Sequence, residues 1–126
     1  MTPMSPQTPE EIKQLVESGL EVATWIPLRE VLEPYLTEPY VRSLRWPYSK
    51  PVIEVTCWIV ADLSHHQEGL TLAYSKYGHG SHAPWGIVLA SDTHIGRDDS
   101  WFAYLEDAYI NCGAWKGSLP EEYEIR

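Results

Sequence analysis

The strongest structural signal in the sequence is a strict alternation of side chains over residues 52–63. Every second position from 53 to 63 is apolar, namely Ile53, Val55, Cys57, Ile59, Ala61 and Leu63. Successive side chains of a β-strand point to opposite faces of a sheet, so a period of two predicts a strand. We expect these residues to face the core and the intervening residues to face away from it.

Two further strands are expected over residues 70–77 and 85–91. Their core-facing residues would be Leu70, Leu72 and Tyr74 in the first strand, and Trp85, Ile87 and Leu89 in the second. The connections between the three strands are short and contain no crossover helix, which predicts an antiparallel meander. The segment 114–126 is expected to wrap the domain, with residues 123–125 adding a fourth strand at an edge.

Helical segments flank this sheet in the sequence. Thr8 and Glu11 form a capping-box pattern that predicts the start of a first helix. Shorter helical segments are expected over residues 27–35 and 39–44, and a long last helix over residues 99–112. The predicted fold class is therefore α+β, with N-terminal helices, a three- to four-stranded antiparallel β-meander and a long C-terminal helix packed on one face.

The length of 126 residues suits one hydrophobic core. We expect the Pro-rich residues 1–7 to be a disordered tail and residues 8–126 to form a single domain. The first residues lack the basic and apolar regions of a signal peptide. Cys57 and Cys112 fall in apolar elements, where we expect buried, unreactive thiols without a disulfide framework. This cysteine usage favours a reducing compartment and predicts a cytoplasmic location.

Acidic residues outnumber basic ones by eighteen to nine, which gives a formal charge of −9. This balance argues against binding to nucleic acid, whose phosphates require Lys and Arg, and against binding to an anionic membrane surface. It would speed the encounter with a basic protein partner. The adjacent acids Glu106 and Asp107 are expected at the polar edge of the last helix, and no residue is predicted to be catalytic.

Aromatic side chains supply the candidate docking surface. Trp and Tyr suit half-buried positions and binding faces, and the sequence has six and eight of them. The expected partner-binding residues are Glu54, Thr56, Trp58, Ser75 and Tyr77 on the outward face of the sheet, with Trp46 and Tyr48 in the preceding Pro-rich loop. Mixed aromatic and polar surfaces are common where proteins bind partners. The alternative is that this loop or the tail covers the face.

The leading functional hypothesis is a non-enzymatic, acidic protein-binding module without a cofactor, such as an inhibitor or regulator of a basic partner of the toxin-neutralising type. An alternative uses side chains that the predicted meander brings to one end of the sheet, namely His65, His66, Asp92 and His94. Imidazole and carboxylate groups are ligands of zinc or a similar divalent metal, so this is a hypothesis of a small metal-dependent enzyme or metal-binding domain. A third hypothesis is a small-molecule pocket under the Trp- and Tyr-rich loops.

Overall fold

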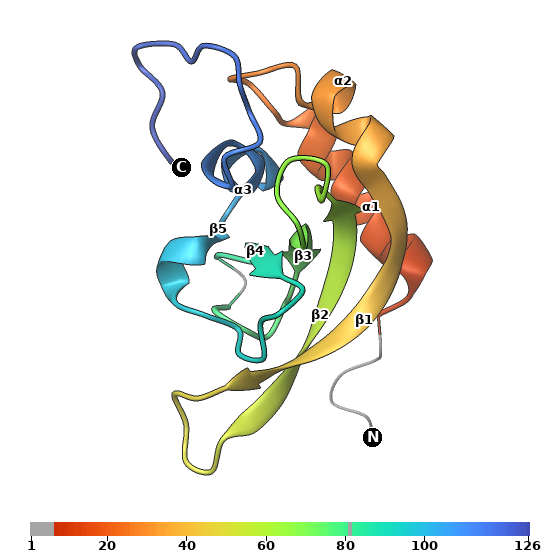
Figure 1. Ribbon diagram of the computed structural model, residues 1–126, viewed down its shortest axis with the longest axis vertical. Coiled ribbons are helices and arrows are strands. Elements are labelled where there is room, and N and C mark those ends of the chain that lie inside the picture. Colours follow the sequence, from red (N-terminus) through yellow and green to blue (C-terminus); the bar gives the residue numbers. More distant parts are fainter. Residues whose placement is uncertain (1–6, 81) are drawn as a thin grey trace.

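A computed structural model describes residues 7–80 and 82–126 (Figure 1). Residues 1–6 of the expected disordered tail lie outside the described residues. An antiparallel sheet of five strands, in the order β1-β2-β3-β4-β5, forms the centre of the molecule. The strands are β1 (Leu36–Trp46), β2 (Ile53–Asp62), β3 (Leu70–Tyr74), β4 (Trp85–Leu89) and β5 (Trp101–Phe102). The predicted meander is confirmed, with one strand added at each edge.

Short helices precede, interrupt and follow this sheet. They are α1 (Pro9–Glu21), α2 (Leu28–Leu32), the 3-10 turns η1 (Glu33–Tyr35) and η2 (Asp98–Ser100), and α3 (Leu105–Asn111). The capping box is present, because the hydroxyl of Thr8 accepts from the Glu11 amide at 3.2 Å and the Thr8 amide donates to the Glu11 carboxylate at 3.0 Å. The predicted α+β class and its N-terminal helices are therefore confirmed.

The expected long C-terminal helix is wrong. The helix α3 has only 7 residues, and the preceding residues Trp101 and Phe102 form β5 opposite Gly86 and Trp85. Trp101 is fixed there because its indole N–H donates to the carbonyl of Ile95 at 2.8 Å. The first apolar residues of the expected helix over residues 99–112 thus belong to a strand.

Two other sequence expectations differ from the structure. Residues 39–44 are not helical but belong to β1, where residues 40–46 pair one by one with β2. Pro39 lies within a register irregularity at the start of this pairing, which suits a residue without an N–H donor. The expected edge strand over residues 123–125 is not formed.

The sheet buries both of its faces. The larger core lies between one face and the helices, with Ile12 and Val16 of α1, Leu32 of α2 and Leu105 of α3 among its members. The smaller core lies on the other face, where Ile95 of the segment before β5 closes over it. The helices and the segment between β4 and β5 therefore cover opposite faces of one sheet.

A bulge at Val60 moves the apolar alternation of β2 from one core to the other. Ile59 pairs with Ala73 and Ala61 pairs with Leu72, so Val60 is an extra residue without a partner on β3. An extra residue reverses the alternation of the strand beyond it. The predicted single core face is consequently wrong: Val55, Cys57 and Ile59 lie in the smaller core, Ala61 and Leu63 lie in the larger core, and Ile53 is exposed.

Within the described residues, no helix has the length and apolar character that crossing a bilayer requires.

Candidate functional site

Several exposed apolar residues lie on the hairpin formed by β1 and β2. The turn end of this hairpin extends away from the helices (Figure 1). Of the eleven large hydrophobic residues that are exposed in the described part of the chain, five lie between positions 40 and 53. They are Tyr40, Val41, Tyr48, Val52 and Ile53, with exposed fractions from 49% to 56%. Tyr40 and Val41 lie in the middle of β1 and the other three at the turn end, and these five residues are together called the apolar cluster. Exposed apolar residues on one element can mark an interaction surface.

The outer edge of β1 borders this cluster. β1 is the first strand in the sheet and has 11 residues, whereas β5 at the opposite edge has two. Arg45 already pairs outward with the neighbouring segment, because its amide donates to Thr93 at 2.9 Å and its carbonyl accepts from Ile95 at 2.9 Å.

The backbone groups of alternate strand residues point to the same edge, so those of Ser43 and Val41 follow Arg45 along it. In the residues that the structure describes, neither makes a backbone hydrogen bond on that side. The edge of β1 is therefore open next to the exposed apolar residues.

The hairpin is electrically neutral within an acidic chain. Residues 36–62 carry three acidic and three basic side chains, namely Glu38, Glu54, Asp62, Arg42, Arg45 and Lys50. The helical segment 9–35 instead carries six glutamates against Lys13 and Arg29. The hairpin itself is thus neutral, and the excess of acid lies in the segments that precede and follow it in the chain.

An aromatic group packs at the turn end of the hairpin. Trp46 contacts both Tyr48 and His79, with ring centroids 4.9 Å apart in each pair. The Tyr48 hydroxyl donates to the carbonyl of Gly96 at 3.2 Å, and Nε2 of His79 lies 3.0 Å from the same oxygen. The two aromatic residues predicted for docking, Trp46 and Tyr48, therefore meet, and they join the hairpin to the loops around residues 79 and 96.

The other predicted docking residues do not share one exposed face. Glu54 and Thr56 are exposed on β2, and Tyr77 is 42% exposed. Trp58 is only 8% exposed and belongs to the larger core, since its position opposite Tyr74 turns it toward the helices. Ser75 is fully buried, and its hydroxyl donates to the carbonyl of Thr56 at 2.8 Å. Trp58 and Ser75 are thus buried, and the expectation that they are exposed for docking is wrong.

The residues of the metal hypothesis each have a separate environment. The ring of His65 stacks on Tyr35 at 3.9 Å, and Asp92 accepts from the Leu89 amide at 2.9 Å. Nδ1 of His94 lies 2.9 Å from the hydroxyl of Thr93. The remaining residue of the set, His66, lies beside Gly113 at the end of α3.

These four residues do not assemble into a metal site. Among residues 7–80 and 82–126 there is no group of three or more His, Cys, Asp or Glu side chains that could hold a metal ion. The geometry therefore offers no support for the zinc hypothesis.

Both thiols are shielded from solvent to different degrees. Cys57 is fully buried, and burial raises the pKa of its thiol to about 11. Cys112 is partly buried, and burial also raises the pKa of its thiol, whose Sγ donates to the carbonyl of Tyr109 at 3.0 Å. A raised pKa keeps a thiol in its less nucleophilic form, so neither environment activates a nucleophile.

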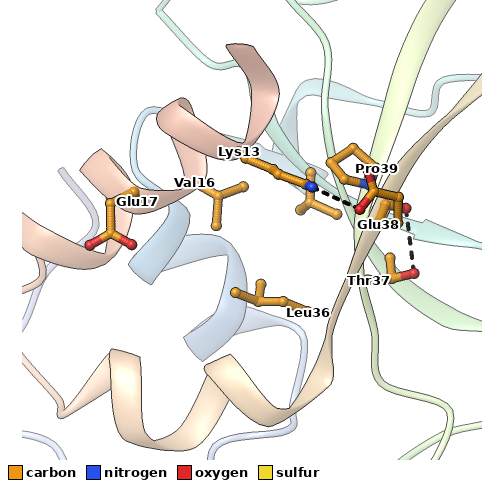
Figure 2. A pocket seen from close by; sticks show the side chains of 8 residues that line it. Lys13, Val16, Glu17, Leu36, Thr37, Glu38 and Pro39 are labelled. Carbon is orange, nitrogen blue, oxygen red and sulfur yellow. Dashed lines mark hydrogen bonds and ion pairs between the residues drawn. The ribbon is translucent and has the colours of Figure 1, made fainter. Parts of the chain in front are cut away.

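A pocket of about 310 Å³ lies between α1 and the start of β1 (Figure 2). Val16, Leu36 and Val60 form its apolar wall, and Lys13 reaches toward Glu38, whose carboxylate lies 2.8 Å from the ammonium. This hydrogen bond raises the pKa of the lysine. The eight residues that line this pocket include no Trp or Tyr, so it is not the pocket expected under the aromatic loops.

The sequence analysis missed two fully buried carboxylates at the start of α3. Glu106 and Asp107 are 0% exposed, although they were expected at the polar edge of a long helix. The amides of Thr24, Trp25 and Ile26 donate to Glu106 at 3.0, 2.7 and 2.9 Å. No signal in the local sequence indicates these partners, because they lie about eighty residues away in the chain.

Comparison of the chain with protein-family models, curated proteins and solved structures finds no significant match.

Proposed function

We propose that this chain is a non-enzymatic protein-binding module that docks through the β1–β2 hairpin. The observation that carries the proposal is the coincidence of the exposed apolar cluster with the open edge of β1. An exposed edge strand recognises an extended segment through main-chain hydrogen bonds, and neighbouring side chains provide selectivity.

The β-bridge between Arg45 and His94 indicates where a partner strand would pair with β1. That bridge already adds one pairing to the outer edge of β1. A partner segment would continue from it by pairing with the backbone of Ser43 and Val41. Alternate side chains of a strand face opposite sides, so Val41 and Tyr40 would contact the partner on the two faces of the extended sheet.

A basic protein is the partner that suits the rest of the surface. The formal charge of −9 lies largely outside the neutral hairpin and would attract a cation-rich surface. Binding of this kind fits an inhibitor or regulator of a basic protein, including one of the toxin-neutralising type. Added salt would slow association, because exposed charges are screened beyond roughly 8 Å at physiological ionic strength.

Two hairpin variants test the docking mode. Ser43→Pro removes an outward N–H at a strand edge, and Ser43→Ala is its matched control because it keeps that donor. Tyr48→Ala combined with Ile53→Ser removes exposed apolar area, with Val22→Ser as a control at an exposed position beside α1.

Each variant is used to pull down binding proteins from a lysate of the source cells, and the amount of every captured protein is measured. The proposal expects one set of captured proteins to be lost with Ser43→Pro and with the Tyr48 and Ile53 double variant, and retained with both controls. Equal capture by all variants, with circular dichroism showing that they are folded, would contradict docking through the hairpin.

A further inference from the structure

The pocket between α1 and the start of β1 lies where the pairing of β1 with β2 is interrupted (Figure 2). Residues 37–39 of β1 lie opposite a single residue of β2, Val60. All four of these residues line the pocket. Bulged strands are common beside functional sites, because a bulge turns side chains in new directions. The pocket is thus formed by the irregular pairing of two strands.

The interior of the pocket is apolar. Val16 of α1 and Leu36 of β1 point into it (Figure 2), and Val60, which is only 1% exposed, also lines it. Its volume of about 310 Å³ lies at the lower end of the roughly 300–1,000 Å³ that is usual for pockets that bind small molecules. A space of this size and character suits one large apolar side chain better than a bulky ligand.

The charged groups that line the pocket are already paired. Lys13 extends to Glu38, whose carboxylate lies 2.8 Å from the ammonium, and both side chains are more than half exposed. The carboxylate of Glu17 accepts from the guanidinium of Arg29 at 3.1 Å. Because these pairs lie at the solvent side of the pocket, an apolar occupant would leave each charge with its counter-ion.

The pocket lies next to the open edge of β1 and on the same face of the sheet. Val41 pairs with Trp58, a member of the larger core, so Val41 faces the side on which the pocket lies. Pro39, two residues before Val41, lines the pocket. Two residues of a strand span roughly 7 Å. A segment that pairs with Ser43 and Val41 would therefore bring its next side chain on this face to the pocket.

We propose that this pocket receives one large aliphatic side chain, such as that of leucine, from the extended segment that docks on β1. The proposal rests on the proposed function, because it names the partner side chain that the open edge would select. Main-chain pairing supplies affinity at a strand edge, and pockets for alternate side chains supply specificity. The partner segment therefore carries a leucine-like side chain two residues away from the one that pairs with Val41.

The first test uses the full chain with N-acetyl-leucine methylamide as the probe and N-acetyl-alanine methylamide as the matched control probe. The readout is the NMR shift of the methyl groups of Val16, Leu36 and Val60. We expect the leucine probe to shift these signals at a concentration about tenfold or more below that needed for the alanine probe, because its larger side chain removes more apolar surface from water. Val16→Phe fills the pocket and should abolish the shifts at Leu36 and Val60, whereas Val22→Phe at an exposed position should retain them.

The second test asks whether the pocket selects the partner. The proteins whose capture is lost with Ser43→Pro should also be lost with Val16→Phe and retained with Val22→Phe. Retention of these proteins with Val16→Phe would overturn the proposal, as would an absent methyl shift or an equal response to the two probes. If Val16→Phe does not fold, Thr37→Phe at the partly exposed start of β1 takes its place.

The two tests separate this proposal from the proposed function. The leucine probe needs no protein partner, so a missing methyl shift contradicts the pocket even where Ser43→Pro reduces capture. Unchanged capture with Ser43→Pro contradicts docking through the hairpin even where the leucine probe binds.

Discussion

The indole of Trp101 lies directly over Gly86 on the neighbouring strand. A methyl group added at Gly86 would lie 2.5 Å from three atoms of that ring, closer than nonbonded atoms can approach. The absence of a side chain at Gly86 thus allows Trp101 to reach the carbonyl of Ile95 and close the smaller core.

Gly86→Ala should destabilise the protein, because the added methyl group displaces a buried indole. Overpacking of this kind typically costs about 1–3 kcal/mol. Urea unfolding followed by circular dichroism measures the loss. The double variant with Trp101→Leu should lose less than the sum of the two single changes, since the clash is removed. Additive losses would show that the two residues do not compete for space.

Trp58→Ala should lower the free energy of unfolding by about 3–5 kcal/mol, which is typical when a large buried aromatic residue is removed. Trp58 is 8% exposed and packs in the larger core. Val22→Ala is the comparison, because substitutions at exposed positions commonly change stability by about 0.5 kcal/mol or less. Near-native stability of Trp58→Ala would instead place this side chain outside the core.

The stability should fall in alkali because of Cys57. Burial raises the pKa of its thiol to about 11 in the folded chain, against an ordinary value of 9.0, so the unfolded chain releases the proton first. The contribution is complete below pH 9 and is lost as the pH rises toward 11, by about 1.4 kcal/mol for each pH unit in that window. Urea unfolding at several pH values measures this slope, and Cys57→Ala should reduce it. An unchanged slope in the variant would contradict the assignment to Cys57.

Glu106→Gln should be strongly destabilising, because it breaks the ion pair of this buried carboxylate with Arg126 and presents an amide N–H₂ group toward backbone donors. Breaking one partner of a buried pair costs about 3–5 kcal/mol. Glu30→Gln on α2 is the matched control, since that side chain is exposed and its loss of charge should change stability little. Thermal unfolding of both variants gives the comparison, and equal melting temperatures would exclude a stabilising role for the Glu106 carboxylate.

The sequence predicted the elements of the sheet better than their faces. The period of two identified β2 correctly, but Val60 adds one residue to the alternation without changing its apolar character. Consecutive residues in the second half of β2 are apolar, so the sequence does not show where the side chains exchange faces of the sheet. Trp58, which precedes the bulge, was expected at the surface for another reason: the alternation does not show that the helices cover the second face of the sheet as well.

The candidate sites were less predictable because they depend on contacts between distant residues. Trp46 and Tyr48 were identified from their aromatic character, and the structure adds His79 to them. The open edge of β1 was missed because residues 39–44 were expected to be helical. The burial of Glu106 depends on amides at residues 24–26, and no local pattern of charge or hydropathy encodes that contact.

The open edge of β1 also affects how copies of this chain behave in concentrated solution. Unpaired strand edges beside apolar side chains are templates on which identical molecules can stack. Here the excess of acid keeps such copies apart, since every molecule repels every other at neutral pH. Acidification would weaken this repulsion while leaving the edge unchanged. The chain therefore has a strand edge that can pair with another strand. Its net negative charge opposes pairing between two copies of this chain but does not oppose pairing with a cationic protein.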